Sequence, residues 1–146
     1  DEAQPDDEPR AERPTTQRRI LVADDNPDAR ESLAALLSLG GHEVFVAEDG
    51  YDALQAAERC RPHVALLDIG MPRANGYEVA RRIRGQPWGR DMVLVALTGW
   101  GQESDRPRSH DAGFDNHLTK PVDPQVLDEF LAQSSMAQTQ LPLQNR

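Results

Sequence analysis

Short apolar runs recur along the middle of the chain, and segments with helical periodicity separate them. The first four runs are continuous rather than alternating, which is typical of parallel strands covered on both faces of a sheet. A fifth and weaker run lies nearer the carboxyl end. The runs span residues 20–23, 44–47, 64–67, 92–97 and 114–119.

The segments between the runs carry the start and stop signals of helices. Asn26-Pro27 pairs an N-cap residue with a proline at the first helical position, and Asp123-Pro124 repeats this pattern. Apolar residues three and four positions apart predict amphipathic helices, while the basic residues of the third helix are expected to solvate its outer face. The helices are expected between Asn26 and Gly40, between Asp49 and Pro62, over about Gly76–Arg84 and Gln102–Ala112, and after Asp123. The residues expected to face inward include Leu33, Leu37, Ala57, Val79, Ile83, Val126, Leu127 and Leu131. The basic residues expected to face outward are Arg81, Arg82 and Arg84.

This alternation, five times over, predicts an α/β fold with a parallel sheet and helices on both faces. Sites in such open sheets form beyond the carboxyl ends of the strands. The residues just after the runs are therefore the candidates for chemistry: Asp24 and Asp25 after the first, Asp68 after the third, Thr98 after the fourth and Lys120 after the fifth. Three carboxylates, a hydroxyl and an ammonium group are expected to converge on one edge.

This set of groups indicates phosphoryl chemistry. Three crowded carboxylates repel one another unless a cation joins them, and ligands that are all oxygen suit Mg²⁺. A carboxylate beside that ion can act as a nucleophile toward a phosphoryl group. Lys120 could then neutralise one phosphoryl oxygen, Thr98 could hydrogen-bond another, and Gly99 would leave room for the group. The pattern predicts a phosphoryl-accepting aspartate.

Composition excludes further kinds of function. The 146 residues carry 25 acids against 16 Lys and Arg, for a net charge of −9, so direct binding to nucleic acid is not expected. The single cysteine, Cys60, excludes an internal disulfide and makes a reducing, cytoplasmic setting the default. No apolar run approaches the length of a membrane span, so no membrane contact by this domain is expected.

The two ends of the chain differ from its middle. Residues 1–17 hold six acids, two Arg and three Pro without a large apolar residue, which predicts a disordered acidic linker. Residues 135–146 are rich in Gln and Ser without periodicity, which predicts a flexible tail. The folded domain is therefore expected over residues 18–134.

Four stretches of the sequence resemble the receiver domain of two-component response regulators: LVADDNPDAR, LLDIGMPRANGYEVARRIR, VALTGW and AGFDNHLTKPVD, over about residues 19–134. The resemblance implies a flavodoxin-like (βα)5 doubly wound sheet, expected in the order 2-1-3-4-5. It also implies that Asp68 is the phosphoacceptor and Lys120 its phosphate-pairing lysine. Mg²⁺ would be held by Asp25, Asp68 and the backbone carbonyl of Gly70, with Asp24 acting mostly through water, and Thr98 would be the switch hydroxyl.

The chain departs from the family pattern at three positions. The switch aromatic of receivers, usually Tyr or Phe, is His117 here, which puts its coupling to Thr98 in doubt. Gly70 supplies no side chain to place an attacking water, and the bulky Trp100 could shield the acyl phosphate. We therefore expect slow hydrolysis of the phosphoryl group.

The stretch LTGWGQESDRPRSHDAGFDNHLTKPVDP is similar to receivers at the C-terminus of hybrid sensor histidine kinases. That resemblance implies a histidine kinase or a histidine phosphotransfer domain as donor. A downstream partner is expected on the face of the fourth helix, fifth strand and fifth helix, with the domain a monomer or weak dimer. We expect no enzyme activity beyond self-phosphorylation and slow self-dephosphorylation.

Three alternatives stay open. A free-standing single-domain response regulator would carry the same site. A phosphohydrolase with an aspartate nucleophile would need a general acid, commonly a second Asp two residues after the first, where this chain has Gly70. A pseudo-receiver that acts only as an interaction module usually lacks an acid or the lysine, and neither is missing here.

Overall fold

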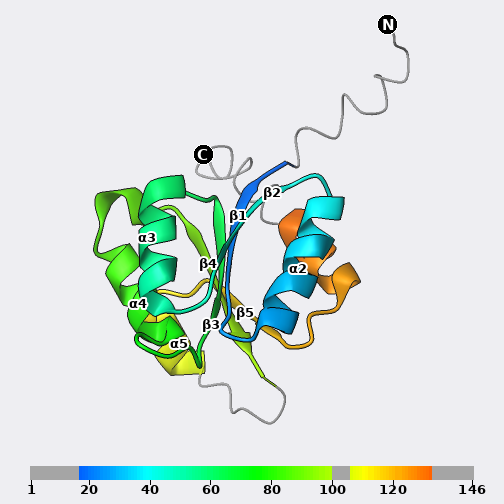
Figure 1. Ribbon diagram of the computed structural model, residues 1–146. Coiled ribbons are helices and arrows are strands. Elements are labelled where there is room, and N and C mark those ends of the chain that lie inside the picture. The colour runs from blue at the N-terminus through cyan, green and yellow to red at the C-terminus, as the bar shows by residue number, and fades with distance from the viewer. Residues whose placement is uncertain (1–16, 100–105, 133–146) are drawn as a thin grey trace, which may run out of the picture.

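The structure, a computed structural model, describes residues 17–99 and 106–132 (Figure 1). The predicted linker, apart from Gln17, and the predicted tail lie outside the described residues, as does Trp100. Among the residues described, no helix combines the length and the apolar character needed to cross a membrane.

Strands and helices alternate along the chain as the apolar pattern predicts. The strands are β1 (Arg19–Ala23), β2 (Glu43–Ala47), β3 (Val64–Asp68), β4 (Val93–Thr98) and β5 (Asn116–Thr119). The helices are α2 (Pro27–Leu39), α3 (Gly50–Cys60), α4 (Gly76–Arg84) and α5 (Arg106–Ala112), with a short 3₁₀ turn η2 (Pro87–Gly89) and a last helix over residues 124–132.

All five strands are parallel and lie in the order β2-β1-β3-β4-β5. Helix α2 and the last helix, drawn in orange, cover one face of the sheet, while α3, α4 and α5 cover the other (Figure 1). The predicted fold class and strand order are confirmed. The carboxyl ends of β1, β3, β4 and β5 therefore meet at one edge, where the candidate residues lie.

The two faces of the sheet explain why the strands read as continuous apolar runs. Along β1, Ile20 and Val22 join the apolar cluster under α2 and the last helix, whereas Leu21 and Ala23 join the cluster under α3, α4 and α5. Successive side chains of a strand point to opposite faces, so a strand covered on both sides needs an apolar residue at every position.

Strand β2 does not follow this expectation. Its run was predicted to be covered on both faces, but Val46 is 52% exposed and only Ala47 is fully buried. The reason is position, because β2 is an edge strand with a neighbour on one side only. The last helix shows a similar error, since Leu127 and Leu131 are buried whereas Val126 is 44% exposed.

The predicted helix boundaries agree closely with the structure where it describes them. Helix α2 follows the cap at Asn26, whose side chain accepts from two backbone N–H groups, and α4 spans the predicted residues. Helix α5 is described from Arg106, so the start predicted at Gln102 lies outside the described residues.

Arg84 was predicted to lie in solvent with its basic neighbours, and this is wrong. Its guanidinium donates to the carbonyls of Gly89 at 2.8 Å, Met92 at 2.6 Å and Gly113 at 3.0 Å, and it pairs with the Asp115 carboxylate at 2.8 Å. The side chain thus ties the end of α4 to the turns before β4 and before β5. A charge count cannot reveal this role, because the partners are backbone carbonyls of other segments.

We predict that Arg84→Ala lowers the free energy of unfolding by about 2–3 kcal/mol, because several backbone carbonyls lose their donor. Urea unfolding measures this. The matched control is Arg82→Ala, which removes only an exposed pair with Glu78 on the same helix and should change stability by less than about 0.5 kcal/mol. Equal effects of the two substitutions would contradict the role of Arg84.

Candidate functional site

The acidic pair follows directly from the central strand β1. Asp24 is 1% exposed, and its backbone N–H donates to the carbonyl of Ala47 at 3.1 Å, so it still belongs to the sheet. Its Oδ1 accepts from the N–H of Asn26 at 2.9 Å, and Asn26 in turn caps α2. Asp25 is exposed. The start of the helix thus holds one carboxylate inward and leaves the other at the surface.

Asp68 is the last residue of β3 and is 4% exposed. Its Oδ1 accepts from the N–H of Gly70 at 3.0 Å, and the ladder continues past it, because the N–H of Ile69 donates to the carbonyl of Leu97 at 3.2 Å. A Cβ on Gly76 would press on the Asp68 carbonyl, so a glycine is needed for α4 to begin this close to the strand. The sequence pattern predicted a helix from about Gly76 but did not reveal this need for a glycine.

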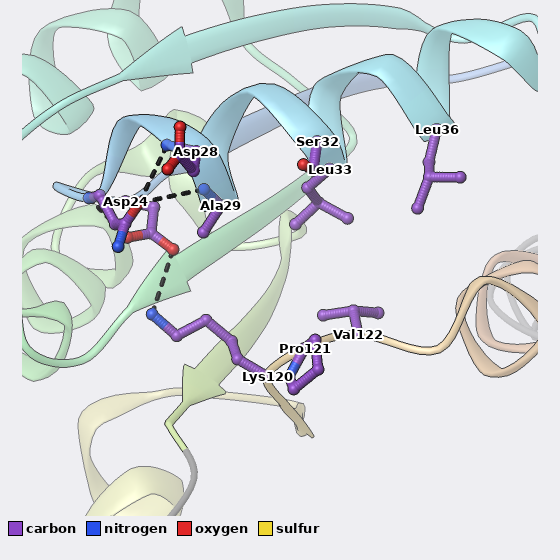
Figure 2. A pocket seen from close by; sticks show the side chains of 10 residues that line it. Asp24, Asp28, Ala29, Ser32, Leu33, Leu36, Lys120, Pro121 and Val122 are labelled. Atoms are coloured by element: carbon purple, nitrogen blue, oxygen red, sulfur yellow. Dashed lines mark hydrogen bonds and ion pairs between the residues drawn. The ribbon is translucent and has the colours of Figure 1, made fainter.

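Lys120 reaches this edge from β5. Its backbone N–H donates to the carbonyl of Thr98 at 2.7 Å, and its peptide bond to Pro121 is cis. Its Nζ donates to Asp24 Oδ2 at 3.1 Å (Figure 2) and lies 3.4 Å from Asp68 Oδ2. One ammonium group therefore bridges two buried carboxylates. The pairing with Asp24 was not predicted, because it joins residues 96 positions apart.

The three predicted acids form one cluster. One carboxylate oxygen from each of Asp24, Asp25 and Asp68 lies within 4.8 Å of the others. Ligands that are all oxygen fit a hard divalent cation such as Mg²⁺, with water completing the shell. The donor set therefore fits that ion. Gly70 lies two residues beyond Asp68 and is exposed at the same place.

The negative charges of the cluster are only partly balanced. Burial and, to a smaller extent, the charge of Asp24 raise the pKa of Asp68 to about 6, while the Gly70 N–H and Lys120 oppose this. Burial lowers the pKa of Lys120, but the charges of Asp68 and Asp24 outweigh it and leave that pKa raised. The site thus holds more negative charge than its single ammonium group balances, which favours an added cation.

The two predicted switch residues lie at different distances from the carboxyl edge of the sheet. Thr98 ends β4, is 3% exposed and lies beside Leu97, the register partner of Asp68. His117 is partly buried on β5 opposite Ala96, two positions before Thr98 on the neighbouring strand. The sheet therefore brings Thr98 to the edge with the acids and Lys120, whereas His117 lies further down β5.

A groove of about 370 Å³ opens beside the Lys120–Asp24 pair. Leu33 and Leu36 of α2 line one side and Val122 lies on the other, as Figure 2 shows. The groove is apolar along its length and charged at the end where Lys120 and Asp24 meet. Leu36 is only partly buried, so its side chain is available at the surface of the groove.

We predict that, without divalent cations, Asp68→Asn stabilises the protein at pH 7 by on the order of 2–3 kcal/mol. The folded state raises the pKa of Asp68 from 3.8 to about 6. As pH rises through that window the unfolded chain loses the proton first, so the wild type loses stability and the advantage of the variant grows. Above this window the advantage is constant.

Urea unfolding in a chelator at several pH values measures this difference. The control is Asp111→Asn, which removes a surface carboxylate of α5 and should change stability by less than about 0.5 kcal/mol. If Asp68→Asn destabilises the protein at neutral pH, the burial of Asp68 does not oppose its charge.

Comparison with known proteins places this geometry in a family. The family model described as the response regulator receiver domain matches residues 20–132. The chain is 43% identical over 114 residues to the response regulator MprA of Mycobacterium tuberculosis, covering 78% of this chain and 47% of that protein. It is 39% identical over 121 residues to an uncharacterized 14.6 kDa protein of Leptolyngbya boryana, covering 83% of this chain and 92% of that one.

A solved structure has a similar fold. The receiver domain of the sensor histidine kinase PA1611 from Pseudomonas aeruginosa superimposes with a TM-score of 0.73 at 33% identity, covering 80% of this chain and 96% of that one. That structure holds a magnesium ion in its active-site cleft. The family match extends from β1 through the last helix and includes all three clustered acids, Thr98 and Lys120. The chain therefore belongs to the response regulator receiver domain family of two-component signalling.

Proposed function

We propose that this domain accepts a phosphoryl group from a phosphohistidine onto Asp68. One observation carries the proposal: a buried carboxylate at the end of β3 lies 3.4 Å from the Lys120 ammonium, within an oxygen cluster that fits a divalent cation. Mg²⁺ would be held by Asp25, Asp68 and the backbone carbonyl of Gly70, with Asp24 acting mostly through water. The magnesium ion in the related Pseudomonas aeruginosa domain supports this choice of ion.

The reaction needs a nucleophile and charge stabilisation. An Asp68 oxygen forms a bond to phosphorus as the bond from phosphorus to the donor imidazole nitrogen breaks, and the electron pair of that bond stays on the imidazole. Bound Mg²⁺ would supply further positive charge for the phosphoryl oxygens. Lys120 is placed to pair with one of these oxygens and the Thr98 hydroxyl with another. The pKa of about 6 keeps Asp68 largely ionised at neutral pH.

Phosphorylation of Asp68 would also change the contacts of the Lys120 ammonium group. Lys120 now divides its charge between Asp24 and Asp68. A phosphoryl group on Asp68 would compete for the same Nζ, and Thr98 would move toward it. We infer that Thr98 and His117 transmit this change to the face formed by α5, β5 and the last helix, where a downstream partner would bind.

Two rival functions fit the site less well. A phosphohydrolase needs a general acid near the nucleophile, and the position two residues after Asp68 is Gly70. A pseudo-receiver would not need the complete set of acids with a bridging lysine, which this structure brings together. The same lack of a side chain at Gly70 supports slow hydrolysis of the acyl phosphate.

The molecular context is a separate proposal. We infer that the domain belongs to a hybrid sensor histidine kinase in the cytoplasm, with a monomer or weak dimer as its own state. The relatives occur in three settings: a sensor kinase, a response regulator about twice the length of the aligned part, and a protein of single-domain size. A free-standing response regulator is therefore the alternative.

The groove beside Lys120 is the place where we expect the phosphodonor protein to contact the domain. It ends at Lys120, whose Nζ lies 3.4 Å from Asp68 Oδ2, and it offers Leu36 and Val122 as an apolar surface. Association there would bring a donor imidazole to the charged end of the groove. A small donor such as acetyl phosphate does not need this surface, which separates docking from chemistry.

We predict one phosphoryl adduct per chain, visible by intact mass, after incubation with acetyl phosphate and Mg²⁺. A chelator and Asp68→Ala should each abolish it, because one removes the counter-charge and the other the nucleophile. Once the donor is removed, the adduct should decay slowly. Decay within seconds would contradict slow hydrolysis, and an adduct that persists in Asp68→Ala would place the acceptor elsewhere. No adduct from acetyl phosphate or a phosphorylated kinase would favour the pseudo-receiver.

We predict that Leu36→Glu slows phosphotransfer from a phosphorylated histidine donor at least about tenfold while leaving the reaction with acetyl phosphate unchanged. The donor is any histidine kinase or phosphotransfer domain shown to phosphorylate the wild type. Leu39→Glu is the matched control, because Leu39 lies on the same helix, is 85% exposed and does not line the groove. Equal transfer rates in the two variants would contradict docking in the groove.

A further inference from the structure

The beginning of the central strand β1 is held by two imidazoles. The backbone N–H of Arg18 donates to Nδ1 of His42 at 3.1 Å, and that of Arg19 donates to Nδ1 of His63 at 2.9 Å. These two successive N–H groups mark the point where residues 1–16 join the domain. The two imidazoles supply the acceptors for these N–H groups.

The two histidines hold equivalent positions in the fold. His42 immediately precedes β2 and His63 immediately precedes β3, the two strands that flank β1. Each contact is closed by a backbone bond in the opposite direction, from Glu43 N–H to the Arg18 carbonyl at 2.9 Å and from His63 N–H to the Arg19 carbonyl at 2.8 Å. Each imidazole therefore completes the ladder on one side of β1.

This end of the sheet is opposite to the acidic cluster. In Figure 1 the dark-blue start of β1 lies at the top, and the strand runs down to the end where α2 begins. Neither histidine contacts a residue of the phosphoryl-accepting site. A change here can therefore be separated from a change at Asp68.

An imidazole Nδ1 accepts a hydrogen bond only when it carries no proton. Protonation would set a donor against a donor at both contacts. Burial first, then Arg18, lower the pKa of His42 against the opposing charge of Asp128 from the last helix. Burial, then Arg19 and Arg18, lower the pKa of His63. Glu43 lines the same small pocket as Arg18, Arg19 and His63.

We propose that His42 and His63 form a pH-sensitive latch: when both are neutral they fasten the start of β1, and when protonated they release Arg18 and Arg19. The release would loosen the junction between the domain and the chain before it. The rest of β1 stays paired, because its backbone ladders to β2 and β3 do not involve an imidazole.

The direction of the pH effect follows from the lowered pKa values. The ordinary pKa of histidine is 6.5, and His42 and His63 take up protons near that value once the contacts are broken. The latch is therefore fully formed above pH 6.5 and is lost as pH falls below it. This is opposite to the contribution of Asp68, whose raised pKa disfavours the folded state as pH rises.

The test is amide hydrogen exchange of Arg18 and Arg19 in the full chain, followed by NMR and corrected for the intrinsic rate at each pH. In the wild type, protection of both amides should fall at least about tenfold between about pH 7.5 and about pH 5.5, while that of Val22 and Leu66 holds. The variant with both His42→Asn and His63→Asn should show no such fall, because an Asn Oδ1 occupies the place of Nδ1 but does not titrate.

Further variants complete the test. His63→Leu removes the acceptor and should leave the Arg19 amide unprotected at every pH, whereas His110→Asn, at an exposed position of α5, should behave as the wild type. Protection that does not change with pH in the wild type, or that falls equally in the double Asn variant, would overturn the proposal. If His63→Leu fails to fold, the double Asn variant still decides the outcome.

Discussion

One ammonium group shared between two buried carboxylates is the interaction on which the site depends. Lys120 comes from the end of β5, while Asp24 and Asp68 come from β1 and β3. Buried charges are costly unless they are paired, and here two acids share one base. The imbalance appears in the raised pKa of Asp68. A site built in this way is less stable alone than with an added cation, and that is useful in a domain whose proposed task is to accept a charged group.

The rest of the fold holds this imbalance in place. The buried β3 positions Asp68, the cap at Asn26 turns Asp24 inward, and the close start of α4 at Gly76 packs on the backbone of Asp68. Because the faces of the sheet are apolar, polar groups concentrate at the two ends of the strands. Carboxylates gather at one end, and imidazoles close the ladder at the other. The two ends therefore respond to pH in opposite directions.

Much of this organisation could be predicted from residue patterns. The apolar runs located five strands, and the residues after them identified the acids, Thr98 and Lys120 as one group. The errors share a cause. Arg84, Val46 and Val126 were interpreted from residue type, but their surroundings are decided by segments remote in the chain. Likewise, a lysine before a proline says nothing of which acid it pairs with 96 residues away.

By itself, the sequence determined the (βα)5 alternation, the edge at which chemistry is expected and the identity of the groups there. These properties are local, because apolar periodicity and helix caps depend on neighbours a few residues away. Only the tertiary structure decided that Lys120 bridges Asp24 and Asp68, that Arg84 joins three segments, and that His42 and His63 close the start of β1. Such contacts depend on strand order and register, which set distances between residues far apart in the chain.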